Sequence, residues 1–155
     1  MVKKKAETSA VELAASIIKK WEGFIPEPYL CPAGVPTIGY GNTMWPNGNR
    51  VEMDDCKIDR KRGAEILEHF IDKVRQQVLD VVEVSLKDHQ LAALISFTYN
   101  VGIGNLSMST LLVKLNDNPE DQTIADEFRR WNKSRGKVLK GLEARREDEV
   151  SLWNG

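Results

Sequence analysis

The stretch WEGFIPEPYLCPAGVPTIGYGN, residues 21–42, carries the pattern that decides the fold. It places a carboxylate, Glu22, at the end of a helical pattern, a thiol, Cys31, nine residues later, and a hydroxyl, Thr37, six residues after that. Glycines and prolines interrupt the rest of the stretch, which is typical of turns that join short strands. The stretch therefore predicts a helix that leads into a glycine-rich hairpin holding the last two of these side chains.

The residues before this stretch predict an amphipathic helix. Ser9 to Glu12 fits a capping box that starts a helix. One face then carries apolar residues at helical spacing, namely Leu13, Ala14, Ile17, Ile18 and Trp21. Gly23 and the prolines that follow end the helix. Glu22 lies at its C-terminal end, where the helix dipole disfavours negative charge, so a purely structural carboxylate is poorly placed there.

Downstream of Glu22 the pattern changes twice. Short extended runs punctuated by glycine and proline fill residues 28–51, and Asn47-Gly48 is a strong hairpin signal, so we expect a small antiparallel sheet. Helical periodicity then returns. The expected helices are 59–80, a segment capped by Ser85 to Asp88, 109–115, a segment that begins at Asn118-Pro119, and 137–152.

These patterns predict one α+β domain over residues 1–155. We expect a small β-hairpin lobe at about residues 28–51, and a larger helical lobe formed by the remainder. The helix at about 59–80 is a natural bridge between the two. A cleft between two such lobes is a suitable place for a polymer substrate.

The composition indicates a soluble globular protein. The chain has 155 residues, 41% of them hydrophobic and 29% charged, and a net charge of -1 that provides no general attraction to nucleic acid or to an anionic cell wall. Eight cations nevertheless lie between Arg129 and Arg146, against the single acid Glu143. This run is either a solvated helix face or an electrostatic surface for a polyanion.

The cysteine and histidine content predicts neither a disulfide scaffold nor a metal site. Two cysteines, Cys31 and Cys56, are either free thiols in a reducing compartment or a pair that blocks Cys31 until it is reduced. His69 and His89 lack ligand spacing to each other or to the cysteines, so we expect no metal or other cofactor.

The N-terminal residues also bear on location. The lysines at residues 3–5 are not followed by a continuous apolar stretch, so we expect no export signal. No segment approaches the roughly 20 apolar residues of a membrane span. We therefore expect a protein made in the cytoplasm, without stable membrane association.

Residues 21–42 resemble the active-site segment of the phage-type lysozymes, glycoside hydrolase family 24. In that family a Glu, an Asp and a Thr occupy the positions of Glu22, Cys31 and Thr37, so here a Cys replaces the Asp. The segments at 97–102 and 127–147 resemble later parts of the family. The resemblance spans nearly the whole chain, and it implies a lysozyme-like fold.

The resemblance also implies roles for individual residues. Glu22 is the expected general acid, and Thr37 positions the attacking water. Three readings of Cys31 stay open: a thiolate that activates water, a nucleophile that forms a covalent sugar intermediate with retention, or a minor contributor that leaves a slower reaction to the other two. The expected substrate-binding residues are Tyr40, Tyr99, Asn100 and Ser109. A basic side chain pairs with the catalytic Glu in the family, and the candidates here are Lys137, Lys140 and Arg145.

The implied function is that of an endolysin, a muramidase that hydrolyses the β-1,4 bond between N-acetylmuramic acid and N-acetylglucosamine in peptidoglycan. Such a bacteriophage enzyme accumulates as a monomer in the host cytoplasm until lysis, depends on a holin to reach the periplasm and cell wall, and has no nucleic-acid partner. Rival readings are a lytic transglycosylase on the same bond, a catalytically silent wall-binding module, and activity on chitin.

Overall fold

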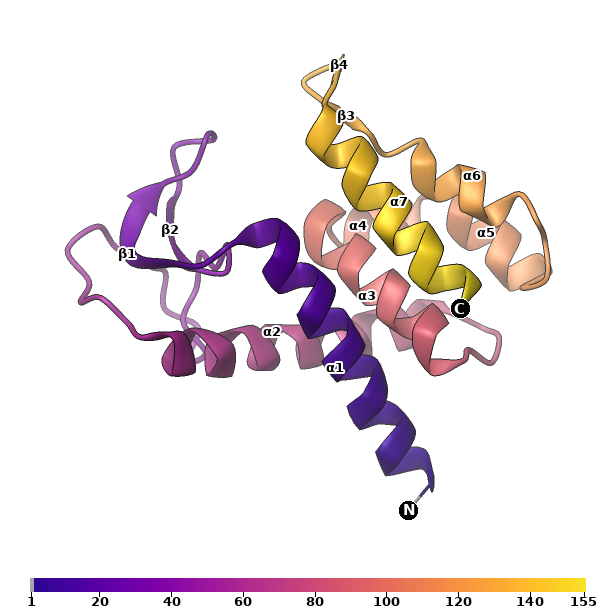
Figure 1. Ribbon diagram of the computed structural model, residues 1–155, viewed down its shortest axis with the longest axis horizontal. Coiled ribbons are helices and arrows are strands. Elements are labelled where there is room, and N and C mark those ends of the chain that lie inside the picture. The colour runs from indigo at the N-terminus through magenta and orange to yellow at the C-terminus, as the bar shows by residue number, and fades with distance from the viewer. Residues whose placement is uncertain (1) are drawn as a thin grey trace.

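The computed structural model describes the backbone of residues 2–155 and the side chains of residues 10–155; it is mainly helical, with two small antiparallel sheets (Figure 1). The elements are α1 (Val2–Glu22), β1 (Ile25–Leu30), β2 (Pro36–Gly39), α2 (Arg60–Val81), α3 (Asp88–Val101), α4 (Ile103–Ser107), α5 (Thr110–Asp117), α6 (Ile124–Arg129), β3 (Lys133–Ser134), β4 (Lys137–Val138) and α7 (Lys140–Asn154). The predicted α+β class is confirmed. Within the described residues, no helix combines the length and the apolar character that crossing a membrane requires.

Helix α3 forms the centre of the helical part. Every residue from Leu91 to Thr98 is buried, as expected of a helix that is covered on all sides. Helices α1, α2 and α7 pack around it, and α1 contributes the fully buried Ala14 and Ile18. The predicted apolar face is confirmed at these two positions; Ile17 and Trp21 are half-buried, and Leu13, expected on the same face, is 37% exposed. The capping box predicted at Ser9 involves a side chain outside the described ones.

Strands β1 and β2 form the hairpin predicted after Glu22. Tyr29 pairs with Thr37, and the register shifts between Ile25 and Tyr29, where β1 contains prolines that cannot donate to a ladder. The turn at Asn47-Gly48 is also confirmed, because the N–H of Gly48 bonds the carbonyl oxygen of Trp45 at 2.9 Å. Regular pairing is shorter than the predicted 28–51, since beyond Gly39 the chain forms only isolated bridges and turns.

Several helix boundaries differ from those predicted. Helix α1 begins at Val2, ahead of the start predicted at Ser9. Helix α2 begins at Arg60, one residue after the predicted start at Asp59, which serves as its cap. Helix α3 begins at Asp88 rather than near Ser85, because Gln90 Oε1 accepts from the N–H of Lys87 at 2.9 Å and shifts the start. Asn118 begins no helix, because its side-chain oxygen accepts from the N–H of Glu120 at 3.0 Å and holds a turn instead.

The predicted helix at 137–152 is also wrong at its start. Residues 133–138 form the β3–β4 hairpin, and α7 begins at Lys140. Arg135 and Gly136 both have positive φ, 51° and 78°, which builds a two-residue hairpin turn where the sequence pattern indicated helix.

A buried charged cluster joins α7 to α3. The carboxylate of Glu149 has no exposed surface; it accepts from the Ser96 hydroxyl at 2.6 Å and from Arg145 Nε at 3.4 Å. Arg146 donates from Nη2 at 3.2 Å, and its Nε forms an ion pair 2.7 Å from Oε1 without hydrogen-bond alignment. Burial raises the pKa of Glu149, and both guanidinium groups oppose that shift.

We expect Glu149→Gln to lower the free energy of unfolding by about 3–5 kcal/mol, because it leaves two buried guanidinium groups without their shared carboxylate. Urea denaturation followed by circular dichroism measures this change. Glu147→Gln is the matched control on the same helix: Glu147 pairs with Arg129 at the surface, so its loss should cost less than about 1 kcal/mol. Equal losses for the two variants would contradict a special role of the buried cluster.

Candidate active site

Glu22 ends α1 and forms an ion pair with α7. Its side chain is 21% exposed, and Oε2 lies 3.2 Å from Nη1 of Arg145, which is itself 4% exposed. The structure thus selects Arg145 from the three basic candidates. Lys137 and Lys140 are exposed and form no ion pair with any carboxylate of the described residues. Because Arg145 also holds Glu149, the candidate acid is fixed through the buried charged cluster.

The loop after β2 closes against Glu22 through a glycine. Gly41 has φ +77°, and a Cβ atom there would lie 3.0 Å from Oε1 of Glu22. Any side chain would therefore press on the carboxylate as well as strain the backbone. This contact sets the β lobe, which we define as residues 25–51, beside the end of α1.

Cys31 follows β1, and its thiol faces a set of hydrogen-bond donors. The backbone N–H of Val35 has the largest effect in lowering the pKa of the Cys31 thiol; the Ala33 and Gly34 N–H groups and the Thr37 hydroxyl add to it, and burial opposes it. The hydroxyl of Thr37 donates to the carbonyl oxygen of Val35 at 2.8 Å. This environment favours the thiolate.

Tyr29 belongs to the same site, although sequence reasoning did not identify it. It is half-buried, and burial raises its pKa first, followed by the negative charges of Glu22 and Cys31. It also pairs with Thr37 across the two strands. The signal was present in the sequence, since Tyr29 and Cys31 are two residues apart and share one face of an extended chain.

Tyr99 connects the β lobe to α3. Its hydroxyl donates to the carbonyl oxygen of Tyr40 and accepts from the side-chain amide of Asn42, both at 2.9 Å. Burial raises the pKa of Tyr99, and the charge of Glu22 raises it further, which places the ring near the carboxylate. The hydroxyl thus uses both hydrogen bonds to hold the β lobe against α3.

A cavity of about 490 Å³ lies where the β lobe, α2 and α3 meet. Its lining residues are Gly41, Asn42, Thr43, Met44, Phe70, Lys73, Val74, Gln77, Thr98, Tyr99, Gly102 and Ile103. Glu22, Cys31 and Thr37 are not among these residues; the cavity approaches the candidate acid through Gly41, where an added Cβ would lie 3.0 Å from Oε1 of Glu22. Its size and mixed lining are suited to a sugar residue of a polymer.

Comparison with known proteins adds the family. Residues 19–149 match the family model described as phage lysozyme. The chain belongs to the phage lysozyme family. The chain is 38% identical to an endolysin of Bacillus phage B103, in an alignment that covers 89% of this chain and 51% of that protein. The chain therefore spans about half the length of that relative.

Two further comparisons agree with membership of the phage lysozyme family. A SAR-endolysin of bacteriophage PS119 is 36% identical, with 85% of this chain and 77% of that protein aligned. The solved structure of an endolysin from Escherichia coli O157:H7 phage FAHEc1 superposes with a TM-score of 0.82 at 30% identity, and covers 91% of this chain and 90% of that one.

The four predicted substrate-binding residues fall into two pairs: two are buried, and two lie at the cavity or at the surface. Tyr40 is 6% exposed, and its ring packs against Phe24 with centroids 5.2 Å apart. Ser109 is buried, donates to the carbonyl oxygen of Leu106, and caps α5. Both side chains thus have structural partners, and their predicted contact with substrate stays a prediction. Tyr99 borders the cavity, and the exposed Asn100 accepts from Arg146 at 3.0 Å, so substrate contact by these two stays a prediction.

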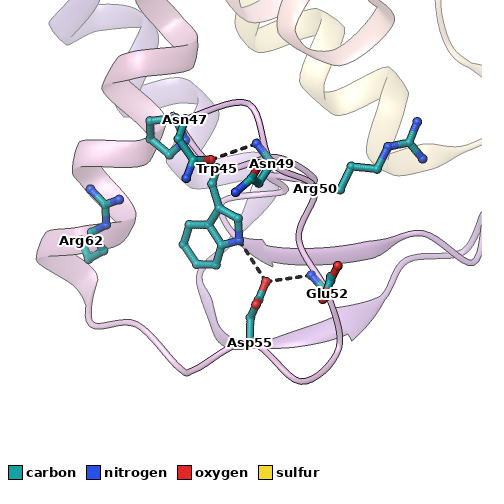
Figure 2. A pocket seen from close by; sticks show the side chains of 8 residues that line it. Trp45, Asn47, Asn49, Arg50, Glu52, Asp55 and Arg62 are labelled. Atoms are coloured by element: carbon teal, nitrogen blue, oxygen red, sulfur yellow. Dashed lines mark hydrogen bonds between the residues drawn. The ribbon is translucent and has the colours of Figure 1, made fainter.

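A second pocket, of about 670 Å³, lies in the loop before α2 and contains none of the predicted catalytic residues (Figure 2). Asp55 organises it, accepting from the indole N–H of Trp45 at 2.9 Å and from the N–H of Glu52 at 2.7 Å. Glu52, Asp54 and Asp55 offer oxygens within 4.8 Å of one another. Since Asp55 already serves as an acceptor for this loop, we assign the group no ion.

We expect the thiol of Cys31 to titrate below the midpoint of a free cysteine measured in parallel, because the backbone N–H of Val35, with smaller contributions from its neighbours and Thr37, lowers its pKa. The rate of iodoacetamide alkylation against pH, in a Cys56→Ser background, measures that midpoint. Thr37→Val should move it upward, since a hydroxyl donor is lost. A midpoint equal to the free thiol's, or unmoved by Thr37→Val, would contradict this assignment.

Proposed function

We propose that the protein is a muramidase of the endolysin type, which hydrolyses the β-1,4 bond between N-acetylmuramic acid and N-acetylglucosamine in peptidoglycan. The observation that carries this proposal is the placement of Glu22, fixed by Arg145, beside a cavity between the β lobe and the helices. Membership of the phage lysozyme family and the endolysin names of its relatives support the substrate.

In the proposed reaction Glu22 donates its proton to the glycosidic oxygen as that bond breaks. The carboxylate that remains is stabilised by the charge of Arg145. Thr37 orients a water molecule, and the Cys31 thiolate accepts its proton as the water oxygen bonds to the sugar carbon. The step leaves Glu22 ionised and Cys31 protonated, and exchange with solvent restores both.

The endolysin names of the relatives support a role in phage lysis. An endolysin produced during phage infection lyses the host at the end of the cycle. We propose that this protein resides in the host cytoplasm as a monomer, reaches the periplasm and cell wall with the help of a holin, and uses no cofactor.

Glu22→Gln should reduce the rate of lysis by at least about 100-fold, because the amide cannot act as the acid. The measurement is turbidity loss of outer-membrane-permeabilised Gram-negative cells, with folding confirmed by circular dichroism. Glu27→Gln is the control, since Glu27 is an exposed carboxylate of β1 with no ion-pair partner among the described residues. Product masses complete the test: hydrolysis adds one water, and products lacking it would indicate a transglycosylase.

The role proposed for Cys31 has its own test. Cys31→Ser should slow hydrolysis by at least about tenfold, because a serine hydroxyl does not accept the water's proton at neutral pH. Cys31→Asp should restore the rate and move the acidic limb of the pH–rate profile downward, since a carboxylate ionises near pH 4 and a thiol near 8.5. Full activity of Cys31→Ser would exclude the thiolate.

A further inference from the structure

The pocket in the loop before α2, which we call the Trp45 pocket, is separate from the cavity of the candidate active site. The two share no lining residue, and the boundary between them falls at one step of the chain, since Met44 lines the cavity and Trp45 lines the pocket. Its volume of about 670 Å³ is within the range of sites that hold small ligands. The proposed reaction makes no use of it.

The ring of Trp45 is held in place by its own loop. Its indole N–H donates to Asp55 at 2.9 Å, as Figure 2 shows, and its backbone N–H bonds the carbonyl oxygen of Asn49 at 2.8 Å. Asp55 also accepts from the N–H of Glu52 at 2.7 Å. The polar edge of the half-buried ring is therefore satisfied, and what the ring offers to a ligand is its π-face. A contact that is formed in advance costs little ordering on binding.

Polar side chains with unused hydrogen-bonding capacity line the same pocket. Asn49 is exposed, and its side-chain amide bonds no described residue. Asn47 uses its side-chain oxygen, which accepts from the N–H of Asn49 at 2.9 Å, so both of its amide N–H bonds stay available. The carboxylate of Glu52 is exposed and accepts from no donor of the described residues. The pocket thus combines an aromatic face with several unused donors and acceptors.

The charges that line the pocket cancel. Arg50 and Arg62 contribute two guanidinium groups, and Glu52 and Asp55 contribute two carboxylates. An anionic ligand would meet the carboxylates and a cationic ligand would meet the guanidinium groups, so the pocket favours a neutral partner. A sugar matches these demands, because its hydroxyl and amide groups lie around the edge of the ring and its C–H bonds form an apolar face.

We propose that the Trp45 pocket binds an N-acetylated sugar residue of the glycan, at a position separate from the bond that is cleaved. This inference rests on the proposed function, which brings the protein to a polymer of such sugars. The ring of Trp45 stacks on the face of the sugar, and the amides of Asn47 and Asn49 bond its hydroxyl and N-acetyl groups. Because no candidate catalytic residue lines the pocket, binding there holds the enzyme on the wall and leaves the chemistry unchanged.

The kinetic test uses three variants of the whole chain, with folding checked by circular dichroism. Trp45→Ala removes the stacking face. Asn49→Ala removes an amide that no described residue uses, so the hydrogen bonds of the loop are retained. Met53→Ala is the matched control, because Met53 is 49% exposed in the same loop and does not line the pocket. The substrates are insoluble cell-wall sacculi and the shortest soluble glycan oligosaccharide that the wild type cleaves.

We expect Trp45→Ala to raise KM on sacculi by about three- to tenfold and Asn49→Ala by about two- to fivefold, with kcat unchanged. Neither variant should alter KM on the shortest oligosaccharide, which fills only the cavity of the candidate active site. Trp45→Phe keeps an aromatic face and should restore most of the affinity for sacculi. Met53→Ala should behave as the wild type on both substrates.

Direct binding is measured by NMR with triacetylchitotriose, a neutral trisaccharide of N-acetylglucosamine, as the probe. The protein carries Glu22→Gln, which prevents cleavage, and the indole N–H signal of Trp45 is assigned by its loss in Trp45→Phe. This signal should shift as the trisaccharide is added. Asn49→Ala should raise the dissociation constant read from it by about two- to fivefold.

Three results would overturn the inference. The first is an indole signal of Trp45 that the trisaccharide does not move. The second is a wild-type KM on sacculi in both Trp45→Ala and Asn49→Ala. The third is an equal rise of KM in Met53→Ala or on the shortest oligosaccharide, which would indicate a structural role of the loop. The two proposals fail separately: a wild type that cleaves no glycan refutes the proposed function, whereas the titration of the Glu22→Gln protein still decides whether the pocket binds the sugar.

Discussion

The buried carboxylate of Glu149 is the constraint on which the site depends. It has no exposed surface, and it is satisfied only because Ser96 and two consecutive arginines of α7 converge on it. Arg145 extends this arrangement to Glu22 on α1. The candidate acid is therefore positioned by helix packing in the interior of the helical part, and a buried ionic cluster of this kind contributes more to geometry than to net stability.

The second constraint is the attachment of the β lobe. The hydroxyl of Tyr99 bonds both Tyr40 and Asn42, and the backbone of Gly41 lies against the Glu22 carboxylate. These contacts fix how far the loop after β2 stands from α3, and so they set the dimensions of the cavity between them. Thr37 is held by the register of β1 and β2, and Cys31 by the turn that follows β1, where its N–H bonds the carbonyl oxygen of Val35 at 3.0 Å.

The fold was largely predictable from local patterns, and the site only partly so. The periodicity of α1, the glycines of the hairpin and the Asp59 cap are local signals, and the structure follows them. The choice of Arg145 was not predictable, because it depends on how α7 lies on α3. The β3–β4 hairpin was missed for a related reason: an Arg-Gly turn in the left-handed region has no clear sequence signal.

The ion pair between Glu22 and Arg145 joins residues 123 positions apart. During synthesis Glu22 leaves the ribosome 123 residues ahead of Arg145, which follows only after α2 to α6 have been made. A nascent chain thus carries the acid, the thiol and the hydroxyl long before the acid has a fixed position, so the order of translation itself delays the assembly of a competent site. Under the proposed function, this delay confines activity to chains whose α7 has already been made.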